Sequence, residues 1–305
     1  MEVNRPGSTA APRRAIGRLG RQRLQIVGCG DIGLRIVARL HGRFRVVALT
    51  SSPLRVPLLR AAGVVPLVGD LDNRATLARL RAFGSRVIHL APPQESGAGD
   101  RRTARLVSVL GQRDKDRTVY ISTTGVYGDQ GGAWIDETAR LATQEARSVR
   151  RIDAERILRR RRRAHVLRVP GIYAHDRLPL ARLRQRQPAL APADDVYTSH
   201  IHADDLARIA IVALLRGRPC RVTNTVDDSG LKMGEYFDLV ARRFGLEPPP
   251  RLAREELKMA VSPMMYSFMA ASRRIRNRRL KRELRVTLRY PTVRDGLEAT
   301  SPGAG

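Results

Sequence analysis

The chain has 305 residues, of which 42% are hydrophobic and 28% charged, and its formal net charge is +28. This length suits two domains of about 100–200 residues each, or one α/β unit with an appended lobe. The two cysteines, Cys29 and Cys220, are too few for a disulfide framework or a metal cluster. The chain contains neither an apolar run near the ~20 residues of a membrane span nor a secretory signal pattern. These features predict a soluble, cytoplasmic protein.

The basic residues are arginines, apart from four lysines, and they are spread over nearly every segment of the chain. A basic surface attracts phosphate groups without specificity, so nucleic acid has to be considered as a partner. Only 4% of the residues are aromatic, however, and no segment interleaves aromatic with basic side chains as a single-strand binding surface does. The composition therefore favours a solvated basic surface over nucleic-acid binding.

Residues 1–22 are rich in Pro, Gly, Arg and Ala without periodicity, which predicts a disordered basic tail. From residue 23 to 176, short apolar runs alternate with segments of helical spacing. Strands are expected within 24–27, 46–49, 64–72, 86–93, 118–129 and 165–173, and helices at 57–62, 76–83, 102–110 and 139–163. This alternation is typical of an α/β protein, so we predict a Rossmann-type, doubly wound parallel sheet.

The pattern becomes less regular beyond Tyr173. A helix is expected at 177–187, a loop over 191–205, a helix at 206–216, a strand within 221–228 and two helical pieces further on. We expect 198–228 to return to the Rossmann domain. Residues 177–197 and 229–305 are then left to form a small, mostly helical lobe on the substrate side.

The string LQIVGCGDIG places a glycine motif, Gly28-x-Gly30-x-x-Gly33, between a strand and a helix. In a dinucleotide site the first glycine permits a tight turn, the second lets the backbone approach the pyrophosphate, and the third allows close packing of helix and strand. The N–H groups that open the helix then face the phosphates. The cofactor-binding residues expected in this loop are Gly28, Cys29, Gly30, Asp31, Ile32 and Gly33.

The end of the second strand reads VVALTSSPLR, without the acidic residue that holds the ribose 2′-hydroxyl of NAD. Small hydroxyl side chains followed by Arg55 suit a 2′-phosphate better, which favours NADP over NAD. The alternative is that Arg55 is merely solvated and the site accepts either form. The cofactor residues expected at the ends of the second, third and fourth strands are Thr50, Ser51, Ser52, Arg55, Asp70, Leu71, Ala91 and Pro92.

Seven strings, VGCGDIG, GDLD, VIHLAPP, ISTTGVYGD, DAERIL, LRVPGIY and HIHADDLA, follow one another within about residues 23–230. Together they resemble the short-chain dehydrogenase/reductase superfamily in its NAD(P)-dependent epimerase/dehydratase branch. The chain is most similar to the atypical, YeeZ-like subgroup, because the extended members carry a further glycine where this chain has Val27. The resemblance implies a Rossmann fold, a nicotinamide cofactor, and a sugar nucleotide or another carbonyl compound as substrate. It leaves the oligomeric state open.

Catalysis in this family depends on a Tyr-x-x-x-Lys pair, which is absent from this chain. Alignment on Glu155 places Arg147 at the tyrosine position and Arg151 at the lysine position. Arg151 could still hold a ribose hydroxyl. Arg147 cannot move the proton as tyrosine does, because a guanidinium stays protonated and accepts no hydrogen bond.

Thr123 falls on the Ser/Thr that orients the reacting oxygen in the family, and it is expected near both the substrate and the cofactor. Tyr127 is a candidate proton donor, with packing at the turn as the alternative. The resemblance also places Pro170 and Gly171 near the nicotinamide. Thr124 and Gly125 stand where dehydratases of the family carry Asp-Glu, which argues against sugar dehydration.

Four other features have a structural and a functional interpretation. His200 and His202, close to Asp204, could suggest a metal, but we favour structural histidines with an acid such as Asp204 capping the next helix. The run 159–163 is expected to be a solvated helix end, not a nucleic-acid clamp. Cys29 lies near a helix N-terminus, which could give it a redox role. The methionines and aromatics of 259–269 are expected in an ordinary core, with an adaptable wall over a substrate as the alternative.

Two functional hypotheses remain. The first is an epimerase-like, NAD(P)-dependent oxidoreductase in which Thr123 orients a carbonyl and another group or water moves the proton. The second is a non-catalytic NADP-binding or redox-sensing protein that retains the cofactor site. Loss of the Tyr-Lys pair favours the second, and the substrate-side lobe favours the first. Nucleic-acid binding is a distant third.

Overall fold

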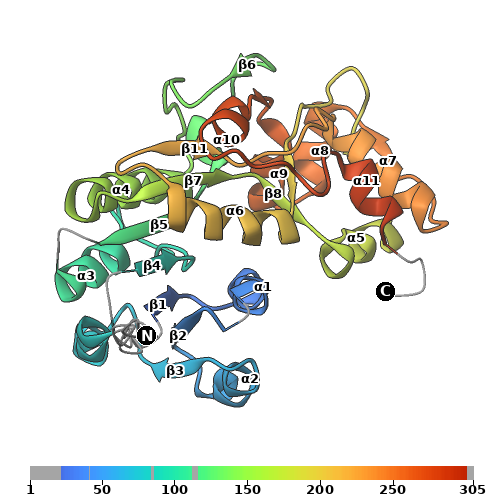
Figure 1. Ribbon diagram of the computed structural model, residues 1–305. Helices are drawn as coiled ribbons and strands as arrows, with labels where there is room; N and C mark the ends of the chain where they lie inside the picture. Colours follow the sequence, from blue (N-terminus) through green and yellow to red (C-terminus); the bar gives the residue numbers. More distant parts are fainter. Residues whose placement is uncertain (1–21, 41, 84–85, 112–115, 301–305) are drawn as a thin grey trace, which may run out of the picture.

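The computed structural model describes residues 22–40, 42–83, 86–111 and 116–300. Its centre is a seven-stranded sheet in the order β11-β7-β5-β4-β1-β2-β3, with every neighbouring pair parallel (Figure 1). The chain winds outward from β1 in one direction and then from β4 in the other, so the strand order reverses between these two strands. This is the doubly wound α/β architecture that the alternating sequence pattern predicts.

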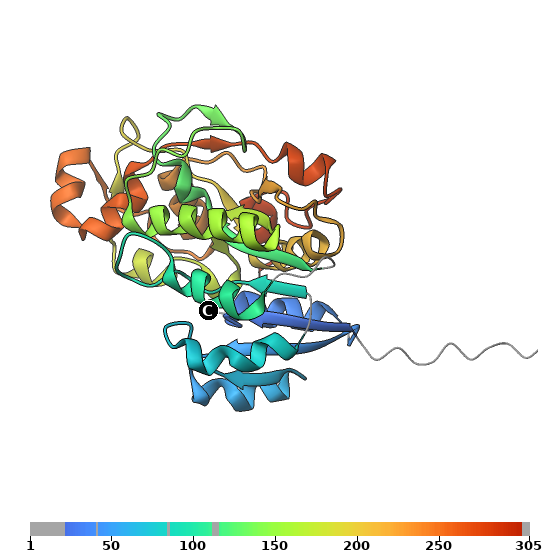
Figure 2. The same cartoon turned by 90° about the vertical axis from the view of Figure 1, so that its left-hand side faces the viewer.

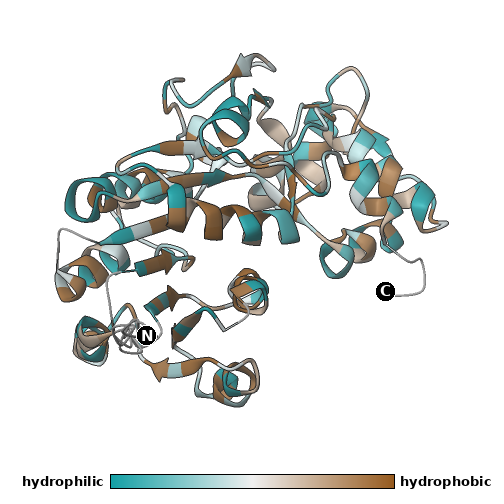
Figure 3. Ribbon diagram, in the orientation of Figure 1, coloured by the Kyte–Doolittle hydropathy of each residue, from teal (hydrophilic) through white to brown (hydrophobic). Residues whose placement is uncertain are grey.

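The strands of this sheet are apolar because helices cover both of its faces. Brown, hydrophobic segments accordingly dominate its middle strands in Figure 3. β7 buries every residue and β1 buries all but its first two, with Leu24, Ile26, Val166 and Leu167 fully inaccessible. The seven strands are β1 (Gln22–Val27), β2 (Phe44–Thr50), β3 (Val65–Val68), β4 (Arg86–His89), β5 (Arg117–Thr123), β7 (His165–Val169) and β11 (Val222–Asn224).

One face of the sheet is covered by α1 (Asp31–Leu40), α2 (Val56–Ala61) and α6 (Ala203–Arg216), whose apolar residues share one core cluster. The opposite face is covered by the 3₁₀ helix η2 (Arg74–Ala82), α3 (Arg101–Leu110) and α4 (Ala146–Arg162). Figure 1 shows α1 beside α6 and α3 beside α4, and these pairs are in contact. The glycine loop, which links β1 to α1, thus lies at the point where the strand order reverses.

A second apolar core lies outside the sheet, in the lobe to the right in Figure 1. In the view of Figure 2 the later part of the chain lies above the first strands, β1 to β3. Three short parallel pairs join distant segments: β8 (Gly171–Tyr173) with β10 (His200–His202), β9 (Ala189–Leu190) with β12 (Arg251–Leu252), and β6 (Trp134–Ile135) with β13 (Arg274–Ile275). The α-helices not yet named are α5 (Leu180–Arg184), α7 (Met233–Arg243), α8 (Arg254–Ala260), α9 (Pro263–Ala270), α10 (Arg278–Arg282) and α11 (Val293–Glu298).

Several expected elements differ from those observed. The helix expected from residue 139 begins only at Ala146, because the segment before it packs in non-helical form against Gly128, whose ideal Cβ would lie 2.8 Å from the Ala142 carbonyl oxygen. The helix expected at 76–83 is the 3₁₀ helix η2. Residues 200–202, expected in a loop, form β10 because β8 offers them a pairing edge.

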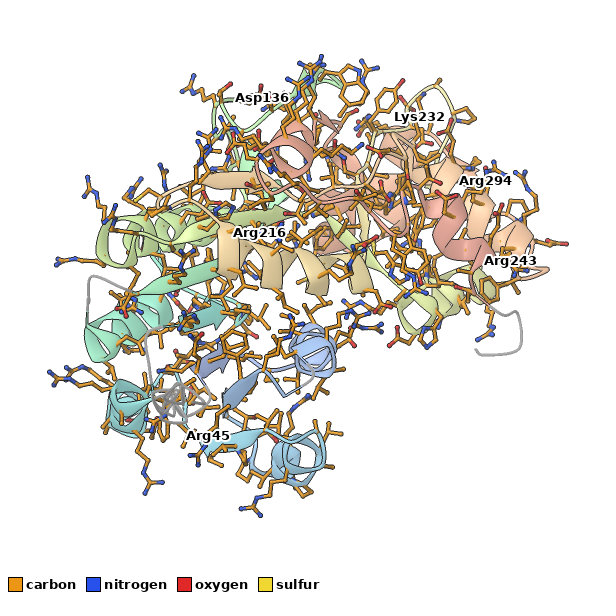
Figure 4. The ribbon with its side chains drawn as sticks, in the orientation of Figure 1. Arg45, Asp136, Arg216, Lys232, Arg243 and Arg294 are labelled. Atoms are coloured by element: carbon orange, nitrogen blue, oxygen red, sulfur yellow. The ribbon has the colours of Figure 1, made fainter. Side chains whose placement is uncertain are left out.

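Residues 1–21 of the expected basic tail lie outside the described residues, whereas Gln22 already belongs to β1. Among the helices that are described, none combines the length and the apolar character needed to cross a bilayer. The labelled arginines of Figure 4, Arg45, Arg216, Arg243 and Arg294, come from β2, α6, α7 and α11. These four arginines therefore come from four separate elements.

Candidate functional site

The loop between β1 and α1 carries the three glycines of the motif. Gly28 has a φ of +83°, and a Cβ there would lie 2.6 Å from the backbone nitrogen of Ala91, so this loop touches the end of β4. A Cβ on Gly33 would lie 2.8 Å from the Sγ of Cys29. Around Gly30, by contrast, the described residues place no heavy atom within 4 Å of the ideal Cβ. The loop is closed on the protein side and open at the glycine that would face a pyrophosphate.

The N-terminus of α1 can receive an anion because the Asp31 carboxylate in its first turn is paired with arginines. Asp31 lies in the first helical turn and forms ion pairs with Arg35 at 2.9 Å and with Arg177 at 3.0 Å. Arg35 also contacts Asp176 and Asp204, so the start of α1 is joined to η4 (His175–Arg177) and to α6. These cations offset the repulsion that Asp31 would exert on a phosphate at the helix dipole. The side chain of the next loop residue, Ile32, packs against the core cluster.

Arg55 connects the end of β2 to the glycine loop. Its Nη2 donates a hydrogen bond to the Cys29 carbonyl at 3.1 Å, from the short 3₁₀ helix η1 (Pro53–Arg55). The buried Thr50 hydroxyl accepts a bond from the Ser52 backbone N–H, while the neighbouring Ser51 is exposed. A guanidinium carries five N–H donors, so the bond to Cys29 leaves donors for a phosphate. Arg55 is thus not simply solvated, because it lies against the loop that would hold the dinucleotide.

Cys29 is not suited to the redox role considered as an alternative. Its side chain is 3% exposed and packs against the position of Gly33. Burial raises the pKa of its thiol to about 11, against the opposing effect of Arg55. Since the thiolate is the reactive form, the buried thiol is inert near neutral pH.

The residues expected after β3 and β4 differ in their contact with the glycine loop. The Ala91 N–H donates to the Val27 carbonyl at 3.1 Å, which places the start of the loop after β4 directly beside β1. Pro92 follows it and is exposed. Leu71 is buried in the same apolar cluster as Ala91, whereas Asp70 is exposed and accepts a bond from the Asp72 N–H. Ala91 is therefore in close contact with Gly28.

Thr123 ends β5 and is partly buried. Its hydroxyl oxygen accepts a hydrogen bond from the Gly125 N–H at 3.1 Å and caps the 3₁₀ helix η3 (Thr124–Tyr127). Tyr127 is fully buried, and its hydroxyl donates to the Asn224 side chain at 2.6 Å. Burial raises the pKa of Tyr127. These contacts account for Tyr127 as a packing residue and give no path for its proton to a ligand.

Arg147 and Arg151, which the sequence resemblance aligns with the Tyr and Lys positions, make contacts with different elements. Arg151 donates to the Ile121 carbonyl at 2.7 Å and to the Tyr120 hydroxyl at 3.2 Å, so its guanidinium is bound to β5. Arg147 extends to α9, where it donates to the Ser267 hydroxyl at 3.0 Å and stacks 3.6 Å from the centre of the Phe268 ring. Neither of these contacts reproduces a tyrosine hydroxyl activated by a neighbouring cation.

Sequence reasoning missed a buried ion pair behind Thr123. Glu155 of α4 accepts two hydrogen bonds from Arg168 of β7, at 3.1 and 2.8 Å, and a third from the Ser122 hydroxyl at 2.6 Å. Both charged residues are only 3–4% exposed. The pair fixes α4 against the ends of β5 and β7, just before Pro170 and the exposed Gly171. The signal was present as Glu in DAERIL and Arg in LRVPGIY, but spacing alone does not pair them.

The histidines near α6 have structural contacts. His202 Nδ1 accepts a hydrogen bond from the Asp204 N–H at 3.1 Å, so His202 caps the helix where an acid was expected. Asp204 instead pairs with Arg35, and buried His200 stacks on Tyr236 with ring centres 4.2 Å apart. Burial lowers the pKa of His200 to about 3, so the imidazole stays neutral. The described residues contain no group of three or more potential ligands arranged for a metal ion.

Two further expectations on the surface need correction. In the run 159–163, Arg162 is 3% exposed and pairs with Asp116, so this helix end is not simply solvated. The expected methionine core of 259–269 is only partly formed, because Met269 is buried whereas Met259, Met264 and Phe268 are exposed. The exposed side chains lie in or beside the short helices α8 and α9, which have little area to bury them.

Comparisons with solved structures find similar folds over nearly the whole chain. A conserved protein of unknown function from Silicibacter pomeroyi DSS is 29% identical, with a TM-score of 0.77 over 91% of this chain and 97% of that one. UDP-glucose 4-epimerase with UDP-glucose, from Thermotoga maritima, is 17% identical, with a TM-score of 0.73 over 92% and 97%. The dTDP-glucose 4,6-dehydratase of Bacillus anthracis str. Ames in complex with NAD is 16% identical, with a TM-score of 0.72 over 92% and 95%.

A scan against family models and a search of curated proteins each returned no match. The structural neighbours nonetheless include epimerases and dehydratases, as the order of the sequence motifs predicts. The assignment to the YeeZ-like subgroup stays a prediction.

Proposed function

Because the chain shares the fold of nucleotide-sugar epimerases and dehydratases, we propose that it is an NADP-binding, epimerase/dehydratase-like protein of the short-chain dehydrogenase/reductase superfamily. One observation carries the proposal. Gly30 is open to a ligand at the N-terminus of α1, beside Arg55 and at the point where the strand order reverses. Open α/β sheets bind dinucleotides at such a point.

The residues present fit the dinucleotide. The backbone at Gly28, Gly30 and Ile32 would hold the pyrophosphate, and Arg55 with Ser51 and Ser52 would hold a 2′-phosphate. The dehydratase neighbour holds NAD, but the end of β2 in this chain offers a cation and hydroxyls where NAD-binding proteins offer a carboxylate. This difference supports NADP as the preferred cofactor.

A bound nicotinamide supplies hydride transfer, and the protein must bind, orient and protonate the substrate. Thr123 is the side chain that would orient a carbonyl, and a sugar nucleotide or a related carbonyl compound is the proposed substrate. UDP-glucose is bound in the epimerase neighbour. The proton would come from water or the substrate itself, since Tyr127 is buried and Arg147 contacts α9.

A non-catalytic NADP-binding or sensing role is the second candidate, and a specific observation favours it. Arg151, at the position of the family's lysine, is bound to the Ile121 carbonyl and the Tyr120 hydroxyl of β5. A side chain with these partners stabilises the strand even when no ribose is present.

Titration with NADPH and NADH tests cofactor binding, with nucleotide fluorescence and thermal shift as readouts. Wild type should bind NADPH more tightly than NADH, and Arg55→Ala should weaken NADPH binding more than NADH binding. Arg60→Ala, at an exposed position on α2, is the matched control and should change neither. Equal losses for the two nucleotides in Arg55→Ala would refute the 2′-phosphate role. Absence of binding to either nucleotide would refute the proposed function.

The two candidates differ in turnover. Oxidation or reduction of the cofactor across a panel of sugar nucleotides and carbonyl compounds, abolished in Thr123→Val, supports an enzyme. Tight NADPH binding without turnover across the same panel supports the non-catalytic role.

A further inference from the structure

The charged residues at the start of α1 form one connected cluster with two other segments. Within α1, Arg35 binds Asp31 at 2.9 Å. Arg35 also binds Asp204, the second residue of α6, at 2.9 Å, and Arg39 binds the other oxygen of Asp204 at 2.9 Å. Because α1 and α6 pack against each other, these four charges lie on a rigid part of the Rossmann domain.

The third segment of the cluster is η4, which adds one charge of each sign. Arg177 Nη1 donates to Asp31 Oδ2 at 3.0 Å, and both oxygens of Asp176 accept from Arg35 Nη2 at 2.7 Å. Asp31 thus has one oxygen on an arginine of its own helix and the other on an arginine from η4. Full neutralisation of the Asp31 carboxylate therefore depends on the position of η4.

Charge holds η4 against α1, whereas apolar packing holds the residues on both sides of η4 in the lobe. None of the three side chains of η4 is buried. Tyr173 before it and Leu180 after it belong to the core cluster of the lobe, and the Tyr173 hydroxyl donates to the Thr292 carbonyl at 3.0 Å. Exposed ion pairs each contribute little to stability. A change of charge at the glycine loop can therefore shift the contact of η4 with α1.

A bound pyrophosphate supplies such a change. In the proposed function it lies at Gly30, directly before Asp31, where the dipole of α1 also attracts an anion. When η4 contacts α1, Asp31 faces the phosphate with both oxygens paired, but without η4 one of these oxygens is unpaired and repels it. The dinucleotide then binds more tightly to the form in which η4 contacts α1. By linkage, a bound dinucleotide strengthens that contact by the same factor.

We propose that the Asp31–Arg177 pair couples occupation of the dinucleotide site to docking of η4 on α1, and thereby to the chain that enters the substrate-side lobe. This inference rests on the proposed function and deepens it by naming how binding at the glycine loop is transmitted to the lobe. Arg177 is a positioning residue, because it acts through Asp31 and does not touch the ligand. A non-catalytic sensor requires such a connection, and an enzyme would use it to order the lobe once the cofactor is bound.

A double-mutant cycle on NADPH and NADH affinity separates this role from direct contact with the cofactor. At low ionic strength, Arg177→Ala should weaken binding of both nucleotides by the same factor, about fivefold, because both carry the pyrophosphate. In an Asp31→Asn background the same substitution should change either affinity by less than about twofold, because no carboxylate is left to neutralise. An equal loss in both backgrounds would overturn the proposal in favour of Arg177 as a direct ligand. No loss in either background would overturn it outright.

The matched control is Arg186→Ala, which removes another exposed, ion-paired arginine from the lobe. Arg186 pairs with Glu247 and has no contact with the cluster at α1, so its loss should leave both affinities unchanged. If Arg186→Ala weakens binding as much as Arg177→Ala does, the effect is one of net charge and the proposal fails. Thermal denaturation checks that each variant is folded.

Hydrogen exchange of the full chain measures the docking of η4 directly. The Arg177 N–H donates to the Ala174 carbonyl and the Leu183 N–H to the Pro179 carbonyl, so exchange over 175–184 reports on this segment. Saturating NADPH should slow this exchange by about threefold or more in wild type but not in Arg177→Ala. Unchanged exchange in wild type with NADPH bound would refute the coupling and leave the proposed function intact. If neither nucleotide binds to wild type, the proposed function itself fails, and this inference fails with it.

Discussion

Replacing Gly30 with alanine separates the folding of the glycine loop from its ligand binding. The described residues leave the ideal Cβ of Gly30 without a neighbour within 4 Å, and its φ lies outside the left-handed region. The substitution should therefore leave stability unchanged or raise it by about 0.4–1 kcal/mol, because alanine restricts the unfolded chain. The new methyl group occupies the space that a pyrophosphate needs, so NADPH affinity should fall at least tenfold, or about 1.4 kcal/mol.

Two other glycines provide the controls. Gly63→Ala also meets no described atom within 4 Å, but its φ of +74° disfavours alanine, so stability should fall by about 1–2 kcal/mol while NADPH affinity is retained. Gly28→Ala combines a φ of +83° with a contact of 2.6 Å to the Ala91 backbone, so it should lose both stability and binding. Urea unfolding and NADPH titration measure the two quantities. Wild-type NADPH affinity in Gly30→Ala would refute the assignment of this loop to the pyrophosphate.

Three further predictions concern buried groups. Glu155→Ala leaves the Arg168 guanidinium buried without its carboxylate. The free energy of unfolding, measured in urea, should therefore fall by about 3–5 kcal/mol. A fall below about 1 kcal/mol would show that the pair does not stabilise the fold. Tyr127→Phe removes the hydrogen bond to Asn224 and should lower stability by about 1–3 kcal/mol, because the amide oxygen loses its donor. NADPH affinity and any turnover should not change. A selective loss of turnover would instead indicate that Tyr127 is a proton donor. The pKa of Asp227 is raised from about 3.9 in the unfolded chain to about 8 in the folded chain, so the folded state binds the extra proton between these values and this group makes stability fall as pH rises. Asp227→Asn should therefore gain stability relative to wild type from pH 4 to pH 8, by at most about 1.4 kcal/mol per pH unit, and a constant difference across that range would contradict the shift.

Local patterns in the sequence were sufficient to predict the central sheet and the glycine loop. Apolar runs of strand length between amphipathic segments define β1, β2 and β7 without knowledge of their partners, because a strand buried on both faces must be apolar. The motif itself predicts the turn at Gly28, whose φ is +83°, although the close approach of Ala91 to this glycine comes from a distant segment. The absence of a Tyr-x-x-x-Lys string can also be read from residue identities alone.

The tertiary structure decided every feature that depends on segments far apart in the chain. The pairing of β6 with β13 joins Trp134 to Arg274, and the ion pair of Glu155 with Arg168 joins α4 to β7. Contacts between distant segments also decide the direction in which Arg147 extends. They likewise decide that Oδ2 of Asp227 is buried without a hydrogen bond to a described residue. Local propensity carries no information on these pairings, because each depends on the burial and charge that distant residues contribute once the sheet has formed. The sequence alone thus determined the fold class and a candidate cofactor loop, whereas the folded chain determined which side chains remain available for chemistry.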